Sequence, residues 1–290
     1  MYKLRDWIDI DNLTWRGLSF NPNAINLLEK NKDKIVCERL SGNTNAIHLL
    51  KKNLDKIDWW WLSRNQSAIS ILERNLDKIN WEKLSENSGA LDILEKNRHK
   101  INWPHLSSNA SAISILEKNQ NKIDWILLSL NTCAISILEK NLDKINWDWL
   151  SLNVSAIPIL EKNPDKINWK FLSKNSNALP ILEKNLDKID WNYLSQNTNA
   201  IAILEENQDK VNWKFLSINP SAIYLLEKNQ DKINWNWFSE NTSIFELDYF
   251  ALKERCSHYK EELIQKALHP FRIIKYLEQG INLEELDNYI

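Results

Sequence analysis

The sequence predicts an all-α protein, an α-solenoid of eleven 22-residue repeats with two helices each and a cap at both ends. One motif recurs at a fixed spacing without insertion, and the apolar residues of each copy follow the helical period. Because such copies stack on their neighbours, we expect one elongated rod or superhelix. Copies 1 to 11 are anchored at Trp15, Cys37, Trp59, Trp81, Trp103, Trp125, Trp147, Trp169, Trp191, Trp213 and Trp235.

The first helix of a copy is predicted to begin at its anchor. In copy 7, Asn146 is a suitable N-cap and Trp147 takes the first helical position. Ile145 lies just outside the cap and Leu150 at the fourth position, which is the pairing called a hydrophobic staple. Pro104 in copy 5 supports this register, because proline fits the first turn of a helix.

The second helix carries Ala, Ile and Leu on one face. Its start stays open, because Pro22 and Pro220 occur earlier than Pro158. The N-cap is either the Asn of the LSxN string or the polar residue two positions later. The closing Asn, such as Asn163, is expected to end the helix in the left-handed conformation, and Pro164 agrees with that end. The lysine that follows three residues later is expected to be a solvated charge facing acidic groups.

A leucine-rich repeat shares the period of 22 and an LxxN-like string. Its consensus requires apolar residues two positions before Leu150 and two after Asn153. Asp148 and Ser155 occupy those positions, so this alternative fails. The unvarying Ser and Asn of the LSxN string are expected instead to join neighbouring copies through hydrogen bonds.

Three segments are predicted: an N-terminal cap at 1–14, the repeat array at 15–241, and a C-terminal helical cap or docking module at 242–290. The first is a half-formed copy that offers Trp7 and Ile10 for apolar contacts. Three helices are expected in the last, at about 243–256, 259–268 and 270–279.

The composition favours a soluble, intracellular protein. The 37 Lys and Arg and 39 Asp and Glu are interleaved and give a net charge of −2, which argues against nucleic acid as a partner. No apolar run approaches the roughly 18 residues of a membrane span, and the first residues lack the layout of a secretion signal, so no membrane partner is expected. The three scattered cysteines predict neither disulfides nor a zinc site.

No arrangement of residues predicts catalysis. The five histidines form no helical pair and no set with cysteine, and the serines recur as scaffold positions. We therefore expect no enzyme, no catalytic residues, no metal and no cofactor. His99 and Asn121, in place of the usual Asp, and Cys37, in place of Trp, are the visible departures from the repeat.

The candidate site is the position two residues after each anchor, which is variable and lies at the edge of the predicted core. In the last five copies this position is always aromatic, so the side chains would form a ribbon that binds a partner. The alternative is that curvature buries the ribbon as additional core. The five residues are Trp149, Phe171, Tyr193, Phe215 and Trp237.

The strings LRDWIDID (4–11), NPNAINLLEKN (21–31), DKINWDWLSLN (143–153) and KEELIQKALHPFRIIKYLE (260–278) resemble the short Trp/Asn-rich repeat proteins of giant viruses of the mimivirus and phycodnavirus kind. The resemblance covers essentially the whole chain. It implies a viral protein in the cytoplasm of an infected host, with the virion as another possible location, and it brings no catalytic residue.

The function expected from these observations is a non-enzymatic protein–protein interaction scaffold that acts on a host or viral protein. It would use the aromatic position and a variable slot held by His48, Asp92 and Tyr224. The alternative is a structural component of the viral particle or viral factory.

Overall fold

The computed structural model describes residues 2–51, 54–267 and 269–278. These residues are mostly helical, which confirms the all-α expectation. The strands β1 (Tyr2–Leu4) and β2 (Phe245–Leu247) pair with each other. Contacts divide the chain into a large unit, Leu4–Phe245, and a unit made of Met1–Lys3 and Glu246–Ile290. No helix within the described ranges is long and apolar enough to cross a membrane.

Every copy in the large unit opens with a short helix at its anchor, as predicted. In copy 7 the Asn146 side chain caps the helix, and Leu150 is fully buried beside Ile145, which is 8% exposed. Helices this short depend on packing for their stability. The first helices are α1 (Trp15–Phe20), α3 (Cys37–Ser41), α5 (Trp59–Arg64), α7 (Trp81–Glu86), α9 (Trp103–Ser107), α11 (Trp125–Leu130), α13 (Trp147–Leu152), α15 (Trp169–Lys174), α17 (Trp191–Leu194), α19 (Trp213–Leu216) and α21 (Trp235–Phe238).

The second helix follows a turn that is capped by the Asn of LSxN. Asn21 Oδ1 accepts the N–H of Asn23 at 3.0 Å, at the start of the 3-10 turn Pro22–Ala24. This turn explains the early proline, because its first residue needs no donor. The second helices are α2 (Ile25–Lys30), α4 (Ile47–Leu50), α6 (Ile69–Leu72), α8 (Leu91–Lys96), α10 (Ile113–Glu117), α12 (Ile135–Glu139), α14 (Ile157–Lys162), α16 (Leu179–Glu183), α18 (Ile201–Glu206) and α20 (Ile223–Glu227).

The closing Asn does not end the helix in the left-handed conformation. Asn163 has a φ of −134° and a ψ of 59°. Its side-chain Nδ2 donates to the carbonyl of Ile159 at 2.8 Å, four residues back. The side chain thus donates a hydrogen bond to a carbonyl of the last turn. In a left-handed helix end, backbone N–H groups would make such bonds instead.

The Ser and Asn of the LSxN string join neighbouring copies, as expected. Between copies 6 and 7, Ser129 Oγ accepts the N–H of Asn146 at 3.0 Å. Asn153 Nδ2 donates to the carbonyls of Ser129 and Asn131 at 3.0 and 3.1 Å. The Ser and Asn side chains are almost fully buried, so these bonds satisfy groups that would be costly to leave unpaired.

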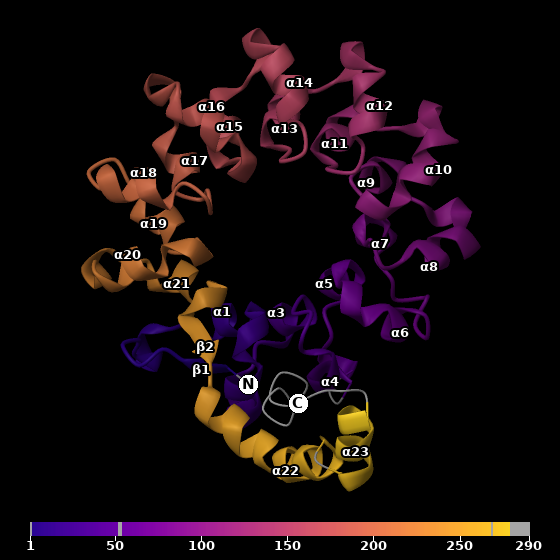
Figure 1. Ribbon diagram of the computed structural model, residues 1–290. Helices are drawn as coiled ribbons and strands as arrows, with labels where there is room; N and C mark the ends of the chain where they lie inside the picture. Colours follow the sequence, from indigo (N-terminus) through magenta and orange to yellow (C-terminus); the bar gives the residue numbers. More distant parts are fainter. Residues whose placement is uncertain (1, 52–53, 268, 279–290) are drawn as a thin grey trace. The chain divides into compact units, whose positions relative to one another are not determined.

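The same bonds join copy 11 to copy 1. Ser239 Oγ accepts the N–H of Thr14 at 2.8 Å, and Asn21 Nδ2 donates to the carbonyls of Ser239 and Asn241 at 3.3 and 2.9 Å. The large unit is therefore a closed ring, with the first helices on its inner side and the second helices outside (Figure 1). The open rod or superhelix that we expected is not formed, because copy 11 bonds to copy 1.

Residues near the N-terminus pack against copy 11 within the same unit. The N–H of Arg5 donates to the carbonyl of Ile244 at 3.0 Å, and Arg5 Nε donates to that of Ser243 at 2.8 Å. The rings of Trp7 and Phe238 lie 5.8 Å apart. These contacts fasten the junction where the ring closes.

The second unit holds α22 (Tyr249–Ala267) and α23 (Pro270–Glu278). The separate helices expected at 243–256 and 259–268 are wrong, since α22 runs through the expected break without a Gly or Pro to end it. The third expected helix corresponds to α23, and its predicted last residue, 279, lies outside the described residues.

Candidate functional site

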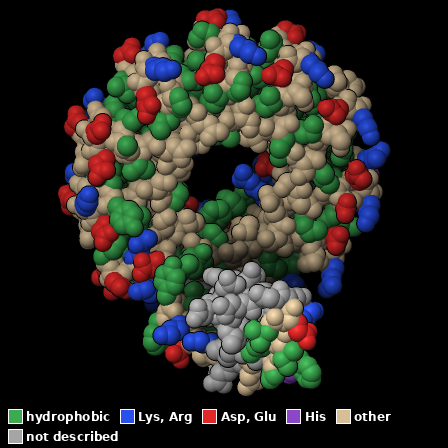
Figure 2. Space-filling model, viewed as in Figure 1, with side chains coloured by type: hydrophobic (Ala, Val, Ile, Leu, Met, Phe, Trp, Pro, Cys, Tyr) green, Lys and Arg blue, Asp and Glu red, His purple; other side chains and the backbone are tan. Residues whose placement is uncertain are grey.

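Five aromatic side chains follow the inner helices of copies 7 to 11. Trp149, Phe171, Tyr193, Phe215 and Trp237 lie on α13, α15, α17, α19 and α21, and each is partly buried. We call these five residues the aromatic arc. Figure 2 shows an opening at the middle of the ring, on the side where the inner helices lie.

The helix caps set the direction of the aromatic side chains. The N–H of Trp149 donates to Asn146 Oδ1 at 3.0 Å, and the N–H of Tyr193 donates to Asp190 Oδ1 at 3.1 Å. In every copy of the arc, the N–H group that the cap accepts belongs to the arc residue itself. Because the cap fixes the first turn, the side chain on the capped residue leaves each copy in the same direction.

Members of the arc contact each other across three of its four junctions. The rings of Trp149 and Phe171 stack with their centroids 5.9 Å apart. Edge-to-face contacts join Phe171 to Tyr193 at 5.6 Å and Phe215 to Trp237 at 5.3 Å. Such pairs are worth about 0.5–1.5 kcal/mol beyond the area that they bury. The arc thus contributes to the junctions and still presents partly exposed rings.

The rings of the arc are neither free surface nor deep core. Leu150, the next residue after Trp149, is fully buried, whereas Trp149 keeps part of its surface exposed. Lys170 Nζ lies 5.1 Å from the ring of Tyr193, and Lys214 Nζ lies 5.1 Å from that of Trp237. The arc is therefore an aromatic surface flanked by positive charge.

The same position carries basic residues in copies 2, 4 and 5. Lys83 Nζ lies 3.2 Å from Glu82 and 3.1 Å from Glu86, and His105 Nε2 lies 3.0 Å from Glu82. Arg39 pairs with Glu240, a residue of copy 11. The sequence shows the variability of this slot but does not predict the acidic partners of its basic residues, which are one and five positions after the anchors.

Eight of the repeated lysines lie over the tryptophan ring of their own copy, and among the described residues none of the eight pairs with an acidic residue of the next copy. Lys166 instead lies 3.5 Å from Asp165 of its own copy. Lys122 Nζ is 4.3 Å from the centroid of the Trp103 ring, and Lys100 Nζ is 4.6 Å from that of Trp81. The expectation of an acidic partner is thus corrected. The ring of the copy's own anchor attracts the cation.

His48, Asp92 and Tyr224 do not join the aromatic arc. They are exposed residues of α4, α8 and α20, which belong to the outer helices. The arc belongs to the inner helices (Figure 1). The two variable slots therefore face different sides of the ring.

No family model, no curated protein and no solved structure matches this chain.

Proposed function

We propose that this chain is a non-enzymatic protein–protein interaction scaffold, which binds a protein partner through the aromatic arc. Its eleven repeats form an α-solenoid closed into a ring, and the first ten have two helices, whereas copy 11 continues from α21 into β2. The observation that carries the proposal is that five consecutive copies present partly exposed aromatic rings at one position. Tyr and Trp side chains are enriched among the residues that dominate binding energy at protein interfaces.

The closed ring supports this role because it holds the arc in place before a partner arrives. Each arc residue sits on a capped helix, and each junction is fastened by buried Ser and Asn side chains. A binding surface that is already ordered loses little conformational entropy on association.

The nature of the partner follows from charge and from the resemblance to giant-virus repeat proteins. Acidic and basic side chains alternate around the outside of the ring (Figure 2), which favours a protein over a nucleic acid. On the resemblance we place the chain in the cytoplasm of an infected host or in the virion, with a host or viral protein as its partner.

The alternative, a structural spacer in the particle or viral factory, needs free ends for end-to-end contacts. The two ends of the repeat array bond to each other through Ser239 and Asn21. The closed array therefore favours the scaffold over the spacer.

The experiment replaces Phe171 and Phe215 together by Ala. It measures the free energy of unfolding of the variant and the set of proteins that the variant captures from host lysate. The matched control replaces Phe20 and Trp60, two partly exposed aromatic residues that do not occupy the position two residues after an anchor, by Ala. We expect both variants to fold and only the arc variant to lose the partner.

An unchanged set of captured proteins would leave the arc without a binding role. A loss of more than about 4 kcal/mol in the arc variant alone would instead make these rings part of the core.

A further inference from the structure

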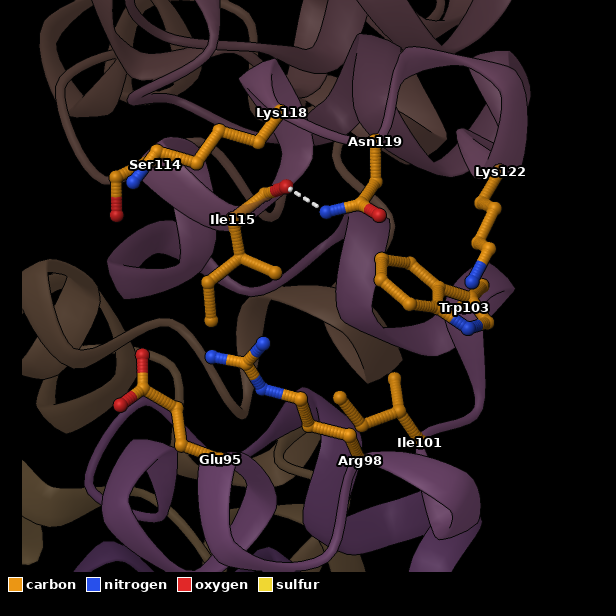
Figure 3. Close-up of a pocket in the computed structure, with 9 residues that line it drawn as sticks. All are labelled: Glu95, Arg98, Ile101, Trp103, Ser114, Ile115, Lys118, Asn119 and Lys122. Carbon is orange, nitrogen blue, oxygen red and sulfur yellow. Dashed lines mark hydrogen bonds between the residues drawn. The ribbon is translucent and has the colours of Figure 1, made fainter.

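A cavity of about 320 Å³ lies between α8 and α10, where copies 4 and 5 meet (Figure 3). It is separate from the aromatic arc and does not depend on the proposed function. Its size is at the lower end of the range for small-molecule sites. Three cations, one carboxylate and several apolar side chains line it, among them Arg98, Lys118, Lys122, Glu95, Trp103 and Ile115.

Arg98 is the residue that distinguishes this cavity. Its guanidinium extends into the space between Glu95 and Ile115 (Figure 3). Among the residues that the structure describes, no carboxylate lies within ion-pair distance of it. A guanidinium without a carboxylate partner is a ready donor of paired hydrogen bonds to an oxyanion.

Three departures from the repeat lie at this cavity or next to its lining in the sequence: Arg98 lines the cavity, His99 follows Arg98, and Asn121 precedes the lining residue Lys122. Copies 6 and 8 have Leu142 and Leu186 where copy 4 has Arg98. The acidic residue that follows in most copies is replaced by His99 in copy 4 and by Asn121 in copy 5. One cation is thus gained and two neighbouring carboxylates are lost.

The chemistry of the lining selects the ligand. Arg98, Lys118 and Lys122 against Glu95 leave an excess of positive charge that matches a phosphomonoester, which carries about −1.5 to −2 near pH 7. Lys122 Nζ lies 4.3 Å from the ring of Trp103, which lines the cavity together with Ile115. These apolar groups suit the body of an aromatic ligand.

We propose that this cavity binds a phosphomonoester carried on an aromatic group. Arg98 and Lys118 would bind the phosphate oxygens, while Trp103 and Ile115 contact the ring. The same chemistry is offered by a small aryl phosphate and by a phosphotyrosine side chain of a peptide.

The test is calorimetric titration of the full chain with phenyl phosphate, with inorganic phosphate and with a short tyrosine-phosphorylated peptide. We expect phenyl phosphate or the peptide to bind with a Kd below about 1 mM, and inorganic phosphate to bind more weakly. Arg98→Leu, which recreates the residue of copies 6 and 8, should weaken binding at least about tenfold. Its melting temperature should not change, because Arg98 has no ion-pair partner among the described residues.

The matched control is Arg74→Leu, an exposed arginine of copy 3 outside this cavity, which should leave binding unchanged. Tighter binding of the peptide identifies a modified protein as the source, and tighter binding of phenyl phosphate identifies a free metabolite. Equal affinity for inorganic and phenyl phosphate, equal losses in the two variants, or no binding of either aryl phosphate would each overturn the proposal.

Discussion

The junction that closes the ring and the junction between copies 6 and 7 use the same hydrogen bonds, but they differ in the room for a side chain two residues after the anchor. At the closing junction, a Cβ on Gly17 would lie 2.5 Å from Ser239 Cβ. At the same position copy 7 carries Trp149, which is accommodated and stacks on Phe171. The closing copies therefore approach more closely, and glycine is the residue that permits it. Closing a ring of repeats thus requires an adjustment at one junction and not at all of them.

The largest effect is expected from Gly17→Ala, which would break the closing junction alone. The added methyl group should force the backbones of copies 1 and 11 apart and cost roughly 1–3 kcal/mol of unfolding free energy. Urea denaturation measures this loss. The control is Gly89→Ser, because Ser67 and Ser111 occupy that position in the adjacent copies. Similar small effects of both substitutions would show that the closing junction is no tighter than the others.

Removing the junction hydroxyl tests whether the two junctions are equally well formed. Ser239→Ala removes the acceptor of the Thr14 N–H, and Ser129→Ala removes the acceptor of the Asn146 N–H. We expect equal losses of about 1–2 kcal/mol in chemical denaturation, since each leaves one donor unsatisfied. A loss for Ser129→Ala without one for Ser239→Ala would mean that the ring is open in solution.

A smaller gain is expected at the junction between copies 1 and 2, where Val36 takes the N-cap position and makes no side-chain cap bond. Val36→Asn should stabilise the protein by about 1 kcal/mol, and the reverse change in copy 7, Asn146→Ala, should cost about as much. Thermal melting of both variants checks the pair. A loss of stability in Val36→Asn would show that packing outweighs capping at this site.

The smallest effect concerns contacts within a copy, which should not depend on distance from the closing junction. Lys34 lies 4.8 Å from the Trp15 ring beside that junction, and Lys144 lies 4.8 Å from the Trp125 ring far from it. Replacing either by Met should cost about 0.5–1 kcal/mol. Lys56→Met is the control, because copy 2 has Cys37 in place of the ring. A different loss at Lys34 and Lys144 would mean that ring closure strains the copies themselves.

The sequence alone was sufficient for the first helices and for the chemistry of the junctions. The capped start at Asn146, the buried Leu150 and the bonding of Asn153 to the preceding copy follow from propensity, capping and burial. The sequence also identified the five aromatic positions of the arc, but it did not predict the ring contacts between neighbouring copies. It failed at Asn163, because the side chain and the backbone compete to satisfy the same helix end, and the sequence does not say which of them does so.

Local interactions determine each copy, so its helices and hydrogen bonds could be deduced from residues close together in the chain. Closure, the Arg39–Glu240 pair and the proximity of copies 1 and 11 arise from the rotation between neighbours, added over the whole array. A different rotation at each junction would give an open superhelix instead of a ring. That rotation depends on side-chain packing across every junction, and only the tertiary structure decides it.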